Sequence, residues 1–161
     1  MAKDGGSSHR KSTMNTSKTP SLPHDPNALL ITKHNGIMKT FRVIIAGSRY
    51  YCNYRKMVAK CDAILANKLN DPDCRVVIVS GCAQGADALG ERYAWRHRLK
   101  VERYPADWEG LGKSAGPVRN EQMAQNADAL IAFPLYGVAN RGTLDMIRRA
   151  REHNLLVRVI H

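Results

Sequence analysis

Three glycine-rich stretches, each directly after a short apolar run, carry residue types that bind phosphate in proteins. The stretches span residues 47–49, 80–87 and 140–143, and the apolar runs before them span residues 43–46, 76–79 and 129–132. A strand that ends in small residues and leads into a helix leaves unpaired backbone N–H groups and a positive dipole end at one edge of a sheet. Such an edge suits phosphate, so the repeated pattern predicts a site for a nucleotide-type ligand.

The first stretch combines three different capabilities. Gly47 allows a close approach of the backbone, Ser48 is suited to cap a helix and to donate to phosphate, and Arg49 offers a planar fork for an anion. An ordinary strand-to-helix turn with an exposed arginine explains the same residues. The stretch is not GxGxxG, so the dinucleotide-binding fingerprint is absent.

The second stretch has small residues at nearly every position, which indicates that something large packs close to its backbone. Ser80, Gly81 and Gly85 belong to it, and Gln84 is suited to hydrogen-bond an amide or the edge of a base. Asp87 stands where a helix is expected to begin, which favours a capping role for its carboxylate. The alternative role for Asp87 is to accept hydrogen bonds from a ribose hydroxyl.

Residues 105–117 are expected to form a long loop at the same edge of the sheet. This loop and the residues after it contribute Trp108, Lys113, Arg119 and Asn120. A tryptophan ring stacks on bases, and lysine and arginine neutralise phosphates, so ligand contact is the favoured interpretation. Loops of this length are commonly functional. The alternative is that Trp108 merely covers the edge of the core.

The third stretch opens the last long helix of the predicted fold. The backbone N–H groups of Arg141 and Gly142 and the hydroxyl of Thr143 form a second phosphate cradle in this interpretation. An ordinary helix start explains the same three residues.

Apolar periodicity around these stretches predicts an α/β fold. Strands are expected at residues 41–46, 75–79, 100–104, 129–132 and 155–160, and helices at 52–69, 86–98, 118–126 and 143–153. This alternation predicts a Rossmann-like doubly wound sheet, mostly parallel, of about five strands with helices on both faces. Ligands bind such sheets beyond the carboxyl ends of the strands, where all three stretches lie.

Composition divides the chain of 161 residues into two parts. Residues 1–39 are rich in Ser, Thr, Lys, Asn and Pro, which predicts a disordered or loosely attached basic arm, and residues 40–161 are expected to form one domain. The net charge of +11 is shared, because residues 1–40 carry +4 and residues 41–161 carry +7. Such a surface attracts nucleic acid non-specifically, and equally favours a small anionic ligand.

The four cysteines predict no metal site, because none forms a CxxC pair and no histidine stands at zinc-ligand spacing. Cys61 fits the buried face of a helix, and Cys82 either touches the ligand or fills space in its turn. The sequence contains no apolar run of the roughly 18–20 residues that span a bilayer, and no secretory signal. The expectation is therefore a soluble, cytoplasmic protein without a membrane partner.

The succession GSR, SGCAQGAD, PADWEGLGKSAGPVRN and RGTLDMIRRA, over about residues 41–160, resembles the YspA-like, cpYpsA-related group of the SLOG superfamily. That superfamily also includes the LOG phosphoribohydrolases and the DprA/Smf DNA-processing proteins. The resemblance implies a Rossmann-like domain that binds a nucleotide or a nucleotide-derived ligand, with no separate cofactor expected. The residues on motif positions are Gly47, Ser48, Arg49, Gly81, Gly85, Asp87, Lys113, Arg119, Asn120, Gly142 and Thr143.

One departure separates this chain from the LOG-type hydrolases, whose GGxGTxxE motif supplies a glutamate for cleavage of an N-glycosidic bond. Here the first glycine pair reads Ala139-Asn140, and the glutamate position is Met146. A thioether cannot act as an acid or a base, and the neighbouring Asp145 is turned by about 100° around the helix axis. The carboxylates left as catalytic candidates are Asp87, Asp107 and Glu121.

The leading hypothesis is therefore a binding or sensing module for a phosphorylated nucleotide derivative. Arg49, Lys113 and Arg119 would hold its phosphate, and Trp108 would cover its base or ribose. One alternative is a LOG-type nucleoside 5′-monophosphate N-glycosidase, and another is DprA-like DNA binding through the basic arm and surface. A homo-oligomer that pairs through helices is also an expectation.

Overall fold

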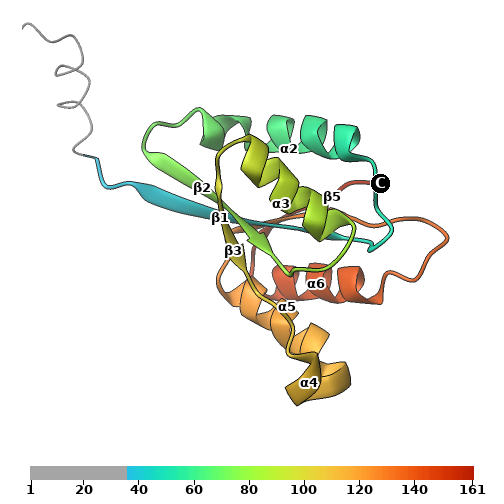
Figure 1. Ribbon diagram of the computed structural model, residues 1–161. Coiled ribbons are helices and arrows are strands. Elements are labelled where there is room, and N and C mark those ends of the chain that lie inside the picture. Colours follow the sequence, from blue (N-terminus) through green and yellow to red (C-terminus); the bar gives the residue numbers. More distant parts are fainter. Residues whose placement is uncertain (1–35) are drawn as a thin grey trace, which may run out of the picture. The chain divides into compact units, whose positions relative to one another are not determined.

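The computed structural model describes residues 36–161, so the basic arm predicted over residues 1–39 falls almost wholly outside the described residues and stays a prediction (Figure 1). In chain order the elements are β1 (Lys39–Gly47), α2 (Tyr54–Leu69), β2 (Cys74–Ser80), α3 (Ala86–Arg96), β3 (Lys100–Arg103), α4 (Trp108–Leu111), the 3₁₀ turn η1 (Gly112–Ser114), α5 (Ala115–Gln125), β4 (Ala129–Phe133), α6 (Arg141–Glu152) and β5 (Leu156–Val159).

The five strands form one parallel sheet in the order β3-β2-β1-β4-β5. Val43 in β1 stands opposite Ile78 of β2 on one side and Ala129 of β4 on the other. The chain builds outward from β1 through β2 to β3, and then returns to the other side of β1 for β4 and β5. The winding therefore reverses between β1 and β4, and this confirms the predicted doubly wound, Rossmann-like sheet.

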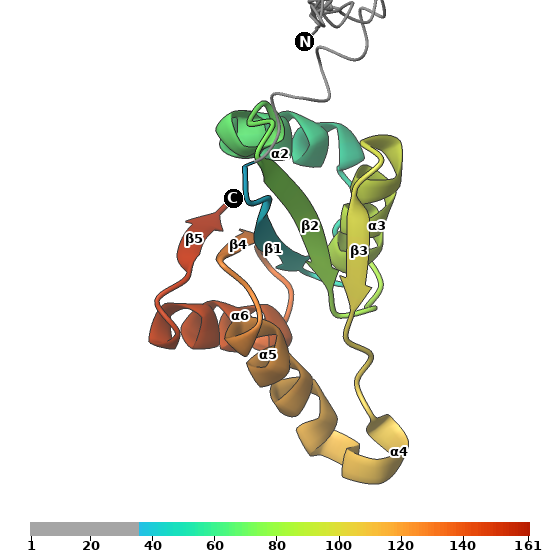
Figure 2. The ribbon, with the colours of Figure 1, turned by 90° about the vertical axis from the view of Figure 1, so that its left-hand side faces the viewer.

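Helices cover both faces of the sheet, with α2 and α3 on one side and α5 and α6 on the other (Figures 1 and 2). Because side chains alternate along a strand, β1 supplies Val43 and Ile45 to one core cluster and Ile44 and Ala46 to the other. All five residues of the interior strand β4 are buried. None of the helices within residues 36–161 has the length and apolar character that a membrane crossing requires.

The first helix matches its prediction closely. Asn53 caps α2 by accepting a hydrogen bond from the backbone N–H of Lys56 at 3.0 Å. The buried face of α2 carries Met57, Cys61 and Leu65, at the spacing that the sequence predicts. Burial raises the pKa of the Cys61 thiol to about 12, so this cysteine is an inert part of the core, as expected.

Several other boundaries differ from expectation by one to three residues. The helix expected to run to residue 98 ends at Arg96, because Arg98 has φ 55° and the Leu99 N–H turns back to the Ala94 carbonyl at 2.8 Å. A similar left-handed residue, Asn154 with φ 58°, follows the end of α6. The last helix also begins two residues early, at Arg141.

The loop expected over residues 105–117 is wrong, because most of that segment is helical. Asp107 caps the short helix α4 by accepting from the Gly110 N–H at 2.8 Å, and Gly112, with φ 53°, ends it. The helix α5 then begins at Ala115 rather than 118 and contains Pro117 in its first turn, where the missing N–H costs no hydrogen bond. The sequence interpretation took these glycines and this proline as signs of a loop.

Candidate functional site

The turn after β1 is held directly against the end of β4, at the point where the winding of the sheet reverses. Ser48 donates its backbone N–H to the Phe133 carbonyl at 3.0 Å. A Cβ atom on Gly47 would lie 2.8 Å from the Phe133 carbonyl carbon and 2.9 Å from Cβ of Ala86. Gly47 therefore does allow a close backbone approach, and the neighbours that require it belong to the protein itself.

The helix-capping role expected for Ser48 is wrong. Asn53 caps α2 instead, and the buried Ser48 hydroxyl accepts from the Tyr50 N–H at 3.2 Å. The carbonyl of Ser48 accepts from the N–H of Ala86, at the start of α3, at 3.2 Å. Arg49 differs from Ser48, since its side chain is exposed and forms no ion pair among residues 36–161.

The turn after β2 wraps around a buried carboxylate. Asp87 is 4% exposed, and its Oδ2 accepts from the backbone N–H groups of Gly81 at 3.1 Å and Ala83 at 3.5 Å. Burial raises the pKa of Asp87, while Arg119 and the two N–H groups act in the opposite direction. Asp87 lies in the first turn of α3, as predicted, but the residue that caps the helix is Gly85. The carboxylate organises the preceding turn.

The first two turns pack against each other backbone to backbone. Gly85 has φ 72°, and a Cβ atom there would collide with the Ser48 carbonyl oxygen and lie 2.5 Å from the Arg49 carbonyl carbon. Ser80 is buried, and its hydroxyl accepts from the backbone N–H two residues later at 3.1 Å. Only Gln84 among the predicted polar contacts of this turn is exposed, so it keeps a free amide at the surface.

Arg119 is committed to the turn after β2 rather than free for a phosphate. One guanidinium nitrogen donates to the Gly81 carbonyl, and Nε donates to Oδ1 of Asn120 at 3.0 Å. A Cβ on Gly81 would lie 2.8 Å from both the guanidinium carbon of Arg119 and Oδ2 of Asp87. Arg119, which the sequence predicts to bind phosphate, therefore also supplies the positive charge next to the buried Asp87 carboxylate.

Asn120 links α5 to the first turn of α6. Its side chain is 4% exposed, and Nδ2 donates to the Gly142 carbonyl at 3.2 Å and to Oδ2 of Asp145 at 3.0 Å. Thr143, the other polar residue of that turn, is 5% exposed. The structure brings Asn120 to the turn that contains Thr143, and both side chains lie within the protein.

The first turn of α6 has no side-chain cap. Asn140 precedes it, but the amide of Asn140 donates to the carbonyls of Leu135 at 2.5 Å and Val138 at 3.1 Å. Arg141 and Gly142 are exposed, and nothing lies within 4 Å of the position that a Cβ on Gly142 would take. The start of α6 therefore consists of exposed residues whose backbone N–H groups have no side-chain cap, as a phosphate cradle requires.

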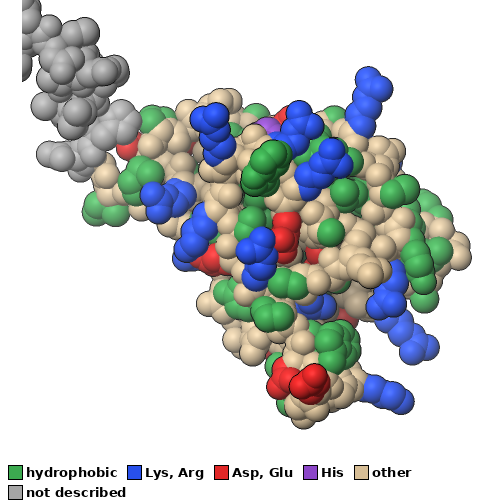
Figure 3. All heavy atoms as spheres, viewed as in Figure 1, with side chains coloured by type: hydrophobic (Ala, Val, Ile, Leu, Met, Phe, Trp, Pro, Cys, Tyr) green, Lys and Arg blue, Asp and Glu red, His purple; other side chains and the backbone are tan. Residues whose placement is uncertain are grey.

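Trp108 and Lys113 lie apart from the turns, on the projecting segment formed by α4 and η1 (Figure 2). The Trp108 side chain is 60% exposed, and its ring lies beside Gly116. Asp107 and Glu109 flank Trp108, and acidic side chains gather over this segment in Figure 3. Negative charge disfavours phosphate, and Asp107 already caps α4, so we find no support here for the predicted base-stacking or catalytic roles.

The candidate carboxylate Glu121 belongs to an ion-pair cluster between α5 and α6. It contacts Arg149 at 2.7 Å and His153 at 2.6 Å. The hydrogen bonds from Arg149 and then from His153 hold the pKa of Glu121 below its usual range. A carboxylate in this state is a poor proton donor, and its partners account for its place in the fold.

Met146, at the position of the LOG-type glutamate, is 1% exposed and packs in the core cluster that contains Ile44 and Leu130. The side chain thus lies against the sheet. Asp145, one residue earlier, is directed to Asn120, Arg148 and Arg149. Neither residue supplies a free carboxylate to the turns.

Two aromatic residues next to the first turn escaped the sequence interpretation. Tyr51 is 6% exposed, and its ring centroid lies 5.0 Å from that of Phe133, so it seals the turn against β4. Tyr50 is 64% exposed beside Arg49. The only available signal was the aromatic pair directly after the GSR stretch, and no periodicity distinguishes its buried member from its exposed one.

Comparisons with known proteins agree with this architecture. The family model described as YspA, cpYpsA-related SLOG family matches residues 41–110. The Gene 61 protein of Mycobacterium phage D29 is 37% identical over 122 residues, which cover 72% of this chain and 93% of that protein. The X-ray structure of DNA processing protein A (DprA) from Streptococcus pneumoniae has a similar fold, with a TM-score of 0.52 and 21% identity.

The match with DprA covers 78% of this chain and 51% of the DprA chain, so the likeness spans about half of DprA and concerns the fold alone. The resemblance read from the four sequence motifs is confirmed by the family model. This chain belongs to the YspA, cpYpsA-related SLOG family.

Proposed function

We propose that the protein binds a nucleotide or a nucleotide-derived phosphorylated ligand at the carboxyl edge of its sheet, around the winding reversal between β1 and β4. The observation that carries this proposal is the uncapped first turn of α6, which Asn120 holds in place from α5. Arg141 and Gly142 are exposed, and the absence of a side-chain cap leaves the backbone N–H groups of that turn for an anion.

Exposed side chains at the same edge complement these N–H groups. Arg49 follows β1 directly and carries a guanidinium without an ion-pair partner among the described residues, and Arg141 begins α6. Tyr50 offers an exposed ring for stacking on a base, and Gln84 offers an amide for its edge. In this proposal these residues replace Trp108 and Lys113, and Arg119 acts by positioning the turn after β2.

Binding is a better fit than cleavage of an N-glycosidic bond. Asp87 is surrounded by the N–H groups of its turn, Asp107 caps a helix and Glu121 is paired with two cations. Met146 is in the core. DNA binding gains no separate support, because the likeness to DprA concerns the fold.

The test is a thermal-shift titration of the full chain with nucleoside monophosphates, diphosphates, ADP-ribose and the matching unphosphorylated nucleosides. We expect at least one phosphorylated compound to raise the melting temperature and to be recovered unchanged, while its nucleoside has no effect. Loss of one charge-assisted contact in Arg49→Ala should weaken binding about tenfold without lowering the melting temperature of the free protein.

Arg151→Ala is the matched control, because Arg151 is an exposed arginine in the last turn of α6, away from the carboxyl edge. Its affinity should equal that of the unmodified chain. The proposal is overturned if no phosphorylated compound raises the melting temperature, or if Arg49→Ala binds as tightly as Arg151→Ala. Release of free base would replace binding by hydrolysis as the function.

A further inference from the structure

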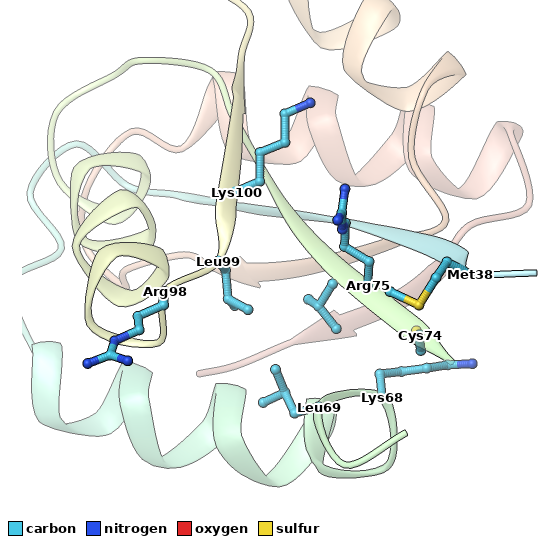
Figure 4. A pocket seen from close by; sticks show the side chains of 9 residues that line it. Met38, Lys68, Leu69, Cys74, Arg75, Arg98, Leu99 and Lys100 are labelled. Atoms are coloured by element: carbon cyan, nitrogen blue, oxygen red, sulfur yellow. The ribbon is translucent and has the colours of Figure 1, made fainter. Parts of the chain in front are cut away.

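A second candidate site lies at the opposite, amino edge of the sheet. A hollow of about 390 Å³ opens there between the ends of α2 and α3 and the beginnings of β1, β2 and β3 (Figure 4). Its volume falls within the range of small-molecule pockets, roughly 300–1,000 Å³. None of the glycine-rich stretches lines it, so it is separate from the site proposed for the nucleotide.

The side chains around this hollow are cationic. Lys68, Arg75, Arg98 and Lys100 line it, all four are exposed, and no acidic residue is among its lining residues. Within residues 36–161 only Lys100 of these four forms an ion pair, a 3.4 Å contact with Glu102, which is closer to Arg42 at 2.9 Å. Lys68, Arg75 and Arg98 therefore carry positive charge without an ion-pair partner among the described residues, and Lys68 lies 5.0 Å from the centroid of the Phe41 ring.

Helix dipoles explain only half of this charge. Lys68 lies in the last turn of α2 and Arg98 follows the end of α3, where cations are stabilising in any protein. Arg75 and Lys100 are at the beginnings of two strands, which have no comparable dipole. Lys100 pairs with Val77 in the sheet, so Arg75 projects from the same face two residues earlier. Figure 4 shows both pointing to the same side.

The inner surface of the hollow is apolar. Leu69, Val76 and Leu99 line it, and Figure 4 shows Leu69 and Leu99 on the same side of β2 as Lys68 and Arg98, while Arg75 and Lys100 project to the other side. Burying an apolar group against these leucines and Val76 is favourable, and Lys68 and Arg98 beside them attract an anionic group attached to it. We infer that the hollow binds an organic anion, with an aromatic or acyl body on the apolar surface and a carboxylate, phosphate or sulfonate at the rim.

A dye with both properties tests the inference, and the full chain is used throughout. Titration with 8-anilinonaphthalene-1-sulfonate should give saturable binding, with backbone amide NMR shifts concentrated at Leu69, Val76 and Leu99. The uncharged analogue N-phenyl-1-naphthylamine should bind about tenfold more weakly, and inorganic sulfate should cause little shift, because each lacks one half of the recognition. Added salt should weaken binding of the sulfonate.

A double variant, Lys68→Gln with Arg98→Asn, should weaken binding of the sulfonate about fivefold and keep the melting temperature, since both residues are exposed. Asparagine is chosen at position 98 because it tolerates the positive φ there. The matched control removes two exposed cations elsewhere, Lys60→Gln with Arg151→Gln, and should bind normally.

The inference is overturned by any one of three results. The double variant binds like its control, the uncharged analogue binds as tightly as the sulfonate, or the NMR shifts fall on residues 47–49 and 81–85. The last result assigns the dye to the carboxyl edge of the sheet. These three results do not depend on the nucleotide proposal, because that proposal is tested separately with phosphorylated nucleosides and the Arg49→Ala variant.

Discussion

The two edges of the sheet use similar residue types in opposite ways. At the carboxyl edge, Gly47 and Gly85 pack against the protein's own backbone. A hydrogen-bonded chain runs there from the Gly81 carbonyl through the side chains of Arg119 and Asn120 to the Gly142 carbonyl. At the amino edge, Arg75 and Arg98 line an apolar hollow and form no ion pair within residues 36–161. A motif residue of a type that binds ligands can therefore stabilise the fold instead, as Arg119 does. An arginine outside the motifs, such as Arg75, can remain exposed and without an ion-pair partner among the described residues.

The difference has a physical origin. Turns at the carboxyl edge bring three backbone segments into van der Waals contact. Glycines permit this approach because they have no Cβ atom, and buried side chains satisfy the hydrogen bonds of the backbone there. What remains for a ligand is the backbone of α6 and the exposed Arg49. At the amino edge, the side chains of Lys68, Arg75, Arg98 and Lys100 are exposed instead.

Substituting glycine at the two edges is the strongest test of this contrast. Gly85→Ala at the carboxyl edge combines a positive φ with a collision against the backbone of the first turn, and we expect a loss of about 3 kcal/mol in the free energy of unfolding. Gly36→Ala near the amino edge meets only the flexible Asp73 carboxylate, at 3.0 Å, and should change little. Urea unfolding monitored by circular dichroism measures both; equal losses would remove the contrast.

Arginine substitutions at the two edges come next in size. Arg119→Gln should cost about 2 kcal/mol in unfolding free energy, because Asp87 stays buried and loses its positive neighbour and the Gly81 carbonyl loses its donor. Arg75→Gln should cost almost nothing, since that side chain is exposed and unpaired within the described residues. Chemical denaturation of the two variants decides whether Arg119 stabilises the fold. If Arg119→Gln were as stable as the parent, Arg119 would again be a candidate for binding the phosphate of the ligand.

Much of the fold was accessible from the sequence, because apolar periodicity and strand-to-helix turns are local signals. The alternation of strands and helices, the burial of Cys61 and the common edge of the glycine stretches all followed from them. The helix α4 did not, since its cap at Asp107 and the proline-tolerant first turn of α5 resemble a loop when only composition is considered.

The roles of individual site residues depend on contacts between distant segments, which local patterns do not encode. Arg49 belongs to a glycine-rich stretch and Arg119 follows the glycines of residues 105–117, yet Arg49 is exposed and Arg119 contacts Gly81, 38 positions away. The amino-edge hollow was invisible for the same reason. Its cations come from the ends of two helices and the beginnings of two strands, which are distant from one another in the sequence and form no common motif.

The smallest effect concerns the charge of Asp87, and its sign separates burial from pairing. Burial raises the pKa of Asp87 in the folded protein above its ordinary value of 3.8. A group with a raised pKa stabilises the folded state most in acid, and this contribution to the unfolding free energy is lost as the pH rises through the folded-state pKa.

Asp87→Asn does not titrate and keeps the volume of the side chain, so its unfolding free energy at neutral pH should lie within about 1 kcal/mol of the parent. In urea titrations the parent should lose stability relative to Asp87→Asn as the pH rises above 3.8, the ordinary pKa of the carboxyl group. Arg75→Gln should follow the parent throughout, because no acidic residue lines its hollow. The opposite slope would mean that Arg119 outweighs burial, and that the carboxyl edge holds an ion pair stabilised by folding.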